Sequence, residues 1–432
     1  MSVEADPELP DPVAPTSKPR LWAVLGPGLI TGAADDDPSG IATYSQVGAQ
    51  FGYAMLWTMI VSYPLMAGIQ EISAWLGRVT GVGIAGNIRR YYPAWVLFPV
   101  IAMLLVANVI NLGADIGAMG SALQLMLGGS AHFYSIEFGV ISVLAAMYIP
   151  YRQYARILKW ATLILFVYVA VAFVVHIPVK VMLVGALVPS LSFSNNYLTA
   201  LTAVFGTTIS PYLFFWQASQ EVQEQRATPE EKPLKHAPEQ APAQLDPMGT
   251  DTYLGMAFSN IIAFFIILDT AVVLYSHGIT DVQTSAQAAE ALRPIAGEFA
   301  FVLFGIGIIG TGLLAIPVLA GSAAYALAEA LKWRAGLEHK PGKAKGFYGI
   351  LCGATLIGVA LNFFMINPIK ALFWSAVVNG VAAAPIMIVM MLMTTNRRVV
   401  GTIRLPMRQK IIGWISTAVM FFVAAGMIAS LI

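Results

Sequence analysis

The chain has 432 residues, of which 58% are hydrophobic and only 11% are charged. Soluble domains carry about 25% charged residues, so this composition excludes a water-soluble surface and indicates an integral membrane protein. The 24 basic and 23 acidic residues nearly cancel, which argues against a nucleic-acid partner, and the single cysteine, Cys352, excludes a disulfide framework and a cysteine-based zinc site.

Eleven apolar stretches are long enough to cross about 30 Å of hydrocarbon. Because lipid offers no partner to free backbone groups, we expect a helix in each and an all-α polytopic fold. Residues 1–19 and the proline-rich loop 223–250 are expected to be disordered, which leaves one transmembrane domain over 20–432. The predicted spans are 21–49, 54–77, 95–127, 133–150, 157–176, 197–222, 252–275, 297–331, 346–366, 368–395 and 411–431.

The basic residues predict the orientation. With a cytoplasmic N-terminus, 21 of the 24 Lys and Arg residues fall in cytoplasmic segments, and only Lys180, Arg293 and Lys370 fall outside. This agrees with the positive-inside rule, and an odd number of spans then places the C-terminus outside. The short loops and the lack of a targeting segment predict a multi-pass protein of a bacterial inner membrane.

The first predicted span contains a helix-breaking sequence near its middle, Asp35-Asp36-Asp37-Pro38-Ser39-Gly40. A charge at the bilayer centre costs at least about 2.5–3.5 kcal/mol. Pro38 removes a backbone donor, and Gly40 adopts dihedral angles that other residues avoid. We therefore expect an unwound stretch at mid-membrane whose carbonyl groups are free to bind something.

The sixth predicted span repeats this arrangement with Gly206-Thr207-Thr208-Ile209-Ser210-Pro211-Tyr212. Helices 1–5 and 6–10 then form two halves that each start with an interrupted helix. This is typical of inverted-repeat transporters, which bind substrate near the midplane between the broken helices. Two ordinary proline kinks are the alternative interpretation, but a kink does not require the carboxylates of the first break.

At this point the sequence resembles the Nramp family of divalent-metal transporters over almost the whole chain after residue 20. The similar segments are GPGLITGAADDDPSGIAT (26–43), QEISAWLGRVTG (70–81), GADIGAMGSALQLMLG (113–128) and MTTNRRVVG (393–401). The resemblance implies a LeuT-type fold, with two inverted repeats and an eleventh helix outside them. It also implies a divalent metal ion as transported substrate, a lipid bilayer as surroundings and no resident cofactor.

The resemblance further implies which residues bind the ion, and here the sequence departs from the family. The family ligands are the Asp and Asn of a DPGN motif, the Met of an MPH motif and a nearby Ala carbonyl. The corresponding residues are Asp37, Gly40, Ser210 and Thr207. Further residues expected in the pocket or pathway are Asp36, Asp115 at the family's helix 3 Glu, Tyr212 at its His, Ala376 at its helix 10 Gln, and Asn379.

These departures predict the ion that is carried. A thioether favours soft metals, whereas carboxylate, hydroxyl and carbonyl oxygens suit hard cations. The changes to Gly40 and Ser210 also remove side-chain volume, so we expect a wide pocket that accepts partly hydrated Mg²⁺. The pattern resembles the Nramp-related magnesium transporter branch and predicts Mg²⁺ transport, with Mn²⁺ tolerated.

The same comparison predicts weak or absent proton coupling. Tyr212 replaces the family's helix 6 His, and a phenol does not titrate near neutral pH. One turn before Asp115 the chain has Leu112 rather than an acid. Uptake is then driven by the ion gradient and the membrane potential.

Local alternatives remain for several residues. The hydroxyls of Ser210 and Thr207 are also suited to satisfy backbone groups freed by Pro211. Asp115 is placed to hydrogen-bond with Asn108 or Asn111 instead of serving as a vestibule or relay acid. Glu221 lies near the end of the sixth span, where a solvated acid is the default expectation.

Three other functions are compatible with parts of the sequence. The first is a conventional proton-coupled Mn²⁺/Fe²⁺ transporter with an unusual ligand set. The second is a LeuT-type carrier of an organic solute with Na⁺, and the clustered carboxylates disfavour an anionic one. The third is an intramembrane aspartyl protease using Asp37 and Asp115, but its Gly-x-Gly-Asp motif is missing, so no enzymatic activity is expected.

Overall fold

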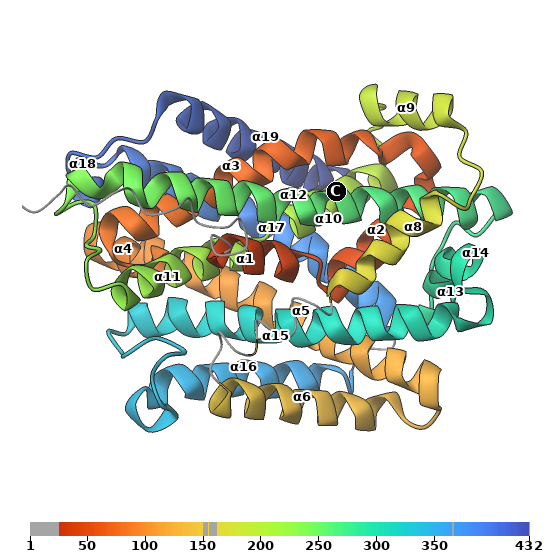
Figure 1. Ribbon diagram of the computed structural model, residues 1–432, viewed down its shortest axis with the longest axis horizontal. Coiled ribbons are helices and arrows are strands. Elements are labelled where there is room, and N and C mark those ends of the chain that lie inside the picture. Colours follow the sequence, from red (N-terminus) through yellow and green to blue (C-terminus); the bar gives the residue numbers. More distant parts are fainter. Residues whose placement is uncertain (1–25, 150–153, 155–161, 365–366, 432) are drawn as a thin grey trace, which may run out of the picture.

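The computed structural model describes residues 26–149, 154, 162–364 and 367–431, and every regular element within them is a helix. The expectation of disorder over residues 1–19 lies outside the described residues. Figure 1 shows long helices running along the longest axis of the molecule, with short helices gathered at its two ends. The all-α fold expected from the composition is confirmed.

Within the described residues, helices lie in the predicted spans in order, and residues 157–161 of the predicted span 157–176 lie outside the described part. The helices that lie in the predicted spans are α1 (Pro27–Asp35), α2 (Pro38–Phe51), α3 (Trp57–Thr80), α5 (Ala94–Leu127), α6 (Ala131–Tyr148), α8 (Phe166–Ala172), α10 (Asn195–Thr208), α11 (Pro211–Ala227), α12 (Ala241–Val273), α15 (Ala300–Ala330), α16 (Lys345–Leu361), α17 (Pro368–Thr395) and α19 (Met407–Leu431). Short helices lie at the two ends: α4 (Ile84–Tyr91) and α18 (Arg397–Val400) at one, α9 (Val179–Leu187), α13 (Ser285–Ala289) and α14 (Arg293–Ala296) at the other.

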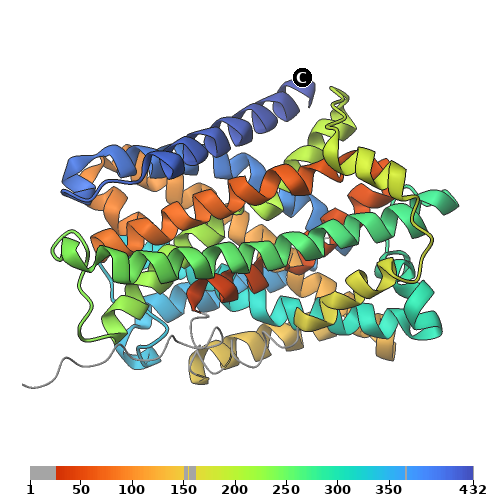
Figure 2. The same ribbon diagram turned by 45° about the horizontal axis from the view of Figure 1, so that its top comes forward.

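Length and hydropathy support a membrane location for these helices. Among the described residues, seven helical segments are long and apolar enough to cross a membrane, and α2 with α3 adds one bent pair with an angle of 109°. The helical segment Leu163–Ala172 and helix α16 are apolar but shorter. The eleventh predicted span, α19, lies at the edge of the bundle (Figure 2), where it packs on α3, α10 and α17.

Both predicted helix breaks are present. α1 ends at Asp35 and α2 begins at Pro38, so Asp36 and Asp37 form the first break. α10 ends at Thr208 and α11 begins at Pro211, so Ile209 and Ser210 form the second. In each case proline occupies the first turn of the second half-helix, where its missing N–H costs nothing.

The second helix of each half covers the broken helix of the other half. α12 packs on α1 and α2, and α3 packs on α11. The contact between α1 and α12 is possible only with small residues, because a Cβ on Gly32 would collide with the backbone of Gly255. Close backbone approach of this kind is a common way to join helices in lipid, where no hydrophobic driving force acts between them.

A carboxylate from α12 holds the start of α1. Asp251 accepts hydrogen bonds from the backbone N–H groups of Gly26, Gly28 and Leu29, at 3.0, 2.6 and 3.2 Å. The first N–H groups of a helix have no partner within the helix, and its N-terminus carries partial positive charge. Asp251 therefore fixes the half-helix that precedes the first break.

The predicted disorder of residues 223–250 is wrong. Helices α11 and α12 extend into this segment from both sides, and the loop between them packs on the end of α3. The N–H of Leu234 donates to the carbonyl of Arg78 at 3.1 Å, and the Leu234 side chain is fully buried. Proline and charged residues correctly indicated a break between helices, but the loop is held by backbone pairing with the end of α3 and by its buried leucine.

Candidate functional site

Asp37 lies in the first break and caps α2. Its Oδ1 accepts hydrogen bonds from the backbone N–H of Gly40 at 2.8 Å and from the hydroxyl of Ser39 at 2.6 Å. This is the usual role of an aspartate before a helix that begins with proline. Only one of the two carboxylate oxygens is used in this way.

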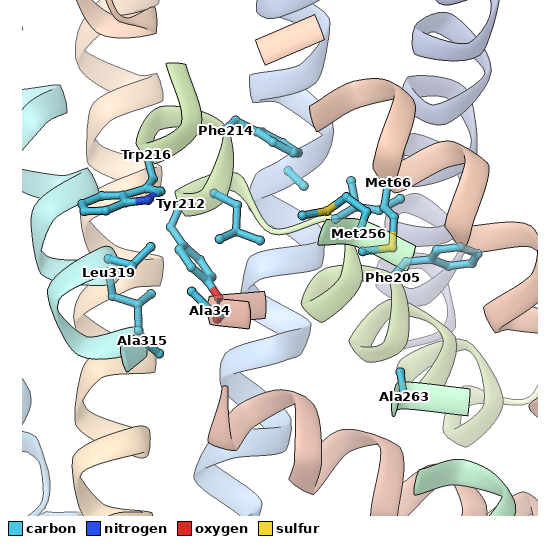
Figure 3. Packing of buried hydrophobic residues seen from close by; sticks show 14 of the residues in the cluster. Ala34, Met66, Phe205, Tyr212, Phe214, Trp216, Met256, Ala263, Ala315 and Leu319 are labelled. Carbon is cyan, nitrogen blue, oxygen red and sulfur yellow. Dashed lines mark hydrogen bonds between the residues drawn. The ribbon is translucent and has the colours of Figure 1, made fainter. Parts of the chain in front are cut away.

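The other oxygen of Asp37 faces side chains from two further helices. Asn111 of α5 donates to Oδ2 at 2.9 Å, and the hydroxyl of Tyr212 of α11 lies 3.3 Å from it. The same hydroxyl is 3.2 Å from the carbonyl oxygen of Ala34, toward which Tyr212 points in Figure 3. Asp37 is only 1% exposed. A cation that binds Oδ2 therefore replaces neutral donors and does not break an ion pair.

Asn111 connects Asp37 to a second acid. Its Nδ2 lies 3.3 Å from Oδ2 of Asp115, and its Oδ1 accepts a hydrogen bond from Ser375 at 2.7 Å. The remaining oxygen of Asp115 is buried without a hydrogen-bond partner. The sequence predicts Asn111 only as a partner of Asp115, and its bond to Asp37 was not predicted. Its position one turn before Asp115, on the same helix face, was the available signal.

The second break supplies carbonyl and hydroxyl oxygens. The hydroxyl of Ser210 lies 2.8 Å from the carbonyl oxygens of both Gly206 and Thr207. This is the backbone-satisfying arrangement that was the alternative interpretation of Ser210. A hydroxyl has one proton and two lone pairs, so its oxygen retains the capacity to accept a further bond or to ligate a cation.

Gly40 brings the two breaks together. A Cβ on Gly40 would lie 3.1 Å from the hydroxyl of Thr207 and 3.3 Å from the ring of Tyr44. The space expected from the loss of a side chain at this position is therefore filled by Thr207 and Tyr44. Gly40 permits close contact between the broken helices and does not by itself widen the pocket.

Asp35 and Asp36 face a different helix from Asp37. The hydroxyl of Ser259 on α12 lies 2.6 Å from Asp35 and 3.0 Å from Asp36. One oxygen of each carboxylate remains buried without a partner. The structure thus separates Asp36, an expected pathway residue, from the group around Asp37 and pairs it with Asp35.

The two expected residues of α17 lie near the second break. A Cβ on Gly206 would collide with the carbonyl oxygen of Ala376, so α10 and α17 are in close contact there. Asn379 follows Ser375 by one turn and is 1% exposed, and neither atom of its amide group has a hydrogen-bond partner. Unpaired buried polar atoms carry a desolvation penalty, so the amide group of Asn379 is available to hydrogen-bond or ligate a bound substrate.

The donor set around the breaks is dominated by neutral oxygens. Within the described part of the chain, no group of three or more His, Cys, Asp or Glu side chains is arranged to hold a metal ion. A cation held here depends on one carboxylate, Asp37, together with hydroxyl, amide and carbonyl oxygens. Such donors are those that hard cations prefer.

A polar chain ties the half-helix α1 to α11 and α3. Thr31 donates to Gln217 at 2.5 Å, Gln217 donates to Glu221 at 2.9 Å, and Arg78 binds Glu221 at 2.7 Å and Glu231 at 2.5 Å. The side chain of Glu221 is only 1% exposed. The expectation of a solvated acid is wrong at this residue, because Arg78 reaches it from the neighbouring helix.

The fold is similar to that of solved transporters. A manganese transporter from Eremococcus coleocola superposes with a TM-score of 0.74 at 15% identity, over 95% of this chain and 87% of that one. Mhp1, a nucleobase-cation-symport-1 family transporter, superposes with a TM-score of 0.61 at 14% identity, over 94% and 90% of the two chains. These similarities confirm the architecture predicted from the two broken helices.

The chain is also similar in sequence to proteins named as divalent metal cation transporters. A divalent metal cation transporter MntH from Klebsiella pneumoniae is 24% identical over 405 residues, which cover 92% of this chain and 91% of that one. The protein of the same name from Chromohalobacter salexigens is 26% identical over 311 residues, 69% of each chain. Residues 28–430 match the model of the natural resistance-associated macrophage protein-like family, and the chain therefore belongs to the Nramp family.

Proposed function

We propose that this protein carries divalent metal cations across a bacterial inner membrane by alternating access, with a preference for the hard ions Mg²⁺ and Mn²⁺. The observation that carries the proposal is the position of Asp37. It is a buried carboxylate at a helix break, with Oδ2 directed to neutral side chains of two other helices. The names of the similar sequences support a divalent cation as the substrate.

The second break supports the preference for hard ions. Ser210 places a hydroxyl where the Nramp resemblance implies a thioether, and Thr207 adds a carbonyl and a hydroxyl beside Gly40. Mg²⁺ gives up its waters reluctantly and is often held through them. Hydroxyl and amide groups accept and donate hydrogen bonds, so they suit an ion that keeps part of its hydration shell. Mn²⁺ accepts the same oxygen ligands.

The residues around Asp37 also support weak or absent proton coupling. Its contacts are with Gly40, Ser39, Asn111 and Tyr212, none of which titrates near neutral pH. We propose that the membrane potential drives uptake, at about 2.3 kcal/mol per charge per 100 mV. The N-terminus is then cytoplasmic and the C-terminus outside, as the distribution of basic residues favours.

Uptake into liposomes tests the proposal. Purified protein reconstituted in vesicles, with a pH dye inside, is expected to admit Mg²⁺ and Mn²⁺ without acidification that matches the flux. Vesicles without protein provide the background. Uptake of Mn²⁺ but never of Mg²⁺, accompanied by protons, contradicts the proposed selectivity and coupling. Uptake of an organic solute with no metal flux rejects metal transport itself.

One observation favours the conventional alternative, a proton-coupled Mn²⁺/Fe²⁺ transporter. Asp115 is an acid with one unpartnered buried oxygen, and Asn111 links it to Asp37. A carboxylate in this position is a reasonable proton acceptor beside a metal site. The pH dye in the same vesicles separates this alternative from the main proposal.

Ser210→Met is expected to shift the ion preference toward Cd²⁺ and Mn²⁺ and to reduce Mg²⁺ uptake, because a thioether is a soft ligand. The measurement is competition between Mg²⁺ and Cd²⁺ for uptake in vesicles. Ser210→Ala is the matched control, since it removes the hydroxyl without adding sulfur and should not gain Cd²⁺ uptake. An unchanged preference in Ser210→Met removes this residue from the site.

A further inference from the structure

A basic cavity opens at the end of the bundle that carries α4 and α18. It lies between α4, α11, the end of α15 and the loop to α16, and its volume is about 400 Å³. The positive-inside rule places this end of the molecule in the cytoplasm. Five cationic side chains and one carboxylate, that of Glu329, line the cavity; the cationic residues are Arg89, Arg90, Arg226, Lys332 and Arg334.

One arginine of the cavity, Arg89, has donors without a hydrogen-bond partner. Nε and Nη1 of Arg89 are buried and make no hydrogen bond, although a guanidinium offers five N–H donors. Arg226 is exposed and donates through Nη2 to the carbonyl of Gly81 at 3.2 Å. Glu329 accepts a hydrogen bond from the backbone N–H of Gly86 at 2.8 Å. Because Glu329 is the one carboxylate among the described residues that line the cavity, the five cationic side chains outnumber the negative charges there.

The loop that forms one wall is held in place by its own contacts. The hydroxyl of Tyr348 donates to the carbonyl of His339 at 2.9 Å, and the N–H of Leu337 donates to the hydroxyl of Tyr325 at 3.2 Å. Trp333 lies against Gly346, where a Cβ would collide with its ring. A wall fixed before binding lowers the entropy cost of taking up a ligand.

We propose that this cavity binds a phosphate-bearing anion, either a soluble phosphate compound or the headgroup of an anionic lipid. A guanidinium presents its donors in a planar fork that matches phosphate oxygens. Basic pockets between transmembrane helices on the cytoplasmic side are suited to anionic headgroups. Trp333, which lines the cavity and is 49% exposed, is the residue type enriched at membrane interfaces.

The simpler explanation is a set of solvated positive charges at the cytoplasmic surface. Two observations distinguish the cavity from such a surface: its cationic residues share one hollow, and two donors of Arg89 have no hydrogen-bond partner. Lys340 and Lys343 belong to the same loop, are exposed and do not line the cavity. They provide a matched control for charge alone.

Titration with inorganic pyrophosphate tests the soluble form of the ligand. The full-length protein in a neutral detergent at low ionic strength is expected to bind pyrophosphate saturably in calorimetry, and more weakly as salt is added. Arg89→Gln combined with Arg226→Gln should weaken binding about tenfold or more, because charge-assisted hydrogen bonds are lost. Lys340→Gln combined with Lys343→Gln should bind like the original protein.

Mass spectrometry of the intact protein tests the lipid form. Phosphatidylglycerol retained where phosphatidylcholine is not, and able to displace pyrophosphate, identifies the ligand as a lipid headgroup. Pyrophosphate binding that phosphatidylglycerol does not affect identifies a soluble ligand. The proposal is overturned when neither probe binds, or when binding is unchanged in the double arginine variant. If Arg89→Gln does not fold, Arg226→Gln alone decides, since this exposed side chain is not needed for packing.

Discussion

Asp37→Asn is expected to lower the initial rate of metal uptake about 100-fold or more. The substitution removes the one carboxylate that faces the helices α5 and α11 at the first break. Removing one partner of a buried charge pair costs about 3–5 kcal/mol, and each 1.4 kcal/mol is a factor of ten. The measurement is the initial rate of Mg²⁺ and Mn²⁺ uptake in vesicles containing equal amounts of protein.

Asparagine tests the charge with little change in shape. Its Oδ1 still accepts the bonds from Gly40 and Ser39, so the start of α2 should be preserved, and only the bonds that Asn111 and Tyr212 donate to Oδ2 are lost. Asp246→Asn is the control, since Asp246 is an exposed acid at the start of α12. Uptake by Asp37→Asn above about a tenth of the original rate would show that this residue is only a helix cap.

Arg78→Gln is expected to be the most destabilising single change at the polar chain, costing about 3–5 kcal/mol of unfolding free energy. Without the guanidinium, Glu221 remains a buried carboxylate with no opposite charge. Glu221→Gln should cost less, because Arg78 keeps its ion pair with Glu231, which is partly exposed. The measurement is thermal unfolding of the purified variants in detergent.

The difference in stability between Arg78→Gln and Glu221→Gln tests whether Glu231 compensates for the loss of Glu221. Arg397→Gln is the control for loss of one positive charge at the same end of the molecule, since its side chain is exposed and the described structure shows no ion pair for it. Equal losses of stability in Arg78→Gln and Glu221→Gln would mean that Glu231 does not compensate. A loss in Arg397→Gln as large as that in Arg78→Gln would assign the effect to net charge.

Much of the fold was predictable because its causes are local. Runs of apolar residues fix where helices cross the membrane, and the lack of hydrogen-bond partners in lipid makes helices the expected structure. Pro38 and Pro211 begin the second half of each broken helix, as their missing donors require. Residues 223–250 were wrongly predicted to be disordered, because their order depends on contacts with the end of α3, more than 100 residues earlier in the chain.

The candidate site was predictable in part. The first break was identified because carboxylates in an apolar stretch are costly without a function, and the resemblance to the Nramp DPGN motif then pointed to Asp37. The effect of Gly40 was not predictable, because Thr207 fills the space that a missing side chain would leave. The pairing of Asp35 with Asp36 through Ser259 was also missed, since the hydroxyl comes from α12.

The sequence by itself determined the all-helical class, the position of both breaks and the carboxylate at the first of them. Each of these follows from the chemistry of residues that are neighbours in the chain. Only the tertiary structure decided that Asn111 and Tyr212 meet Asp37, and that Arg78 buries its charge against Glu221. The physical reason is that partners from distant helices are selected by packing, and packing depends on all the contacting side chains at once.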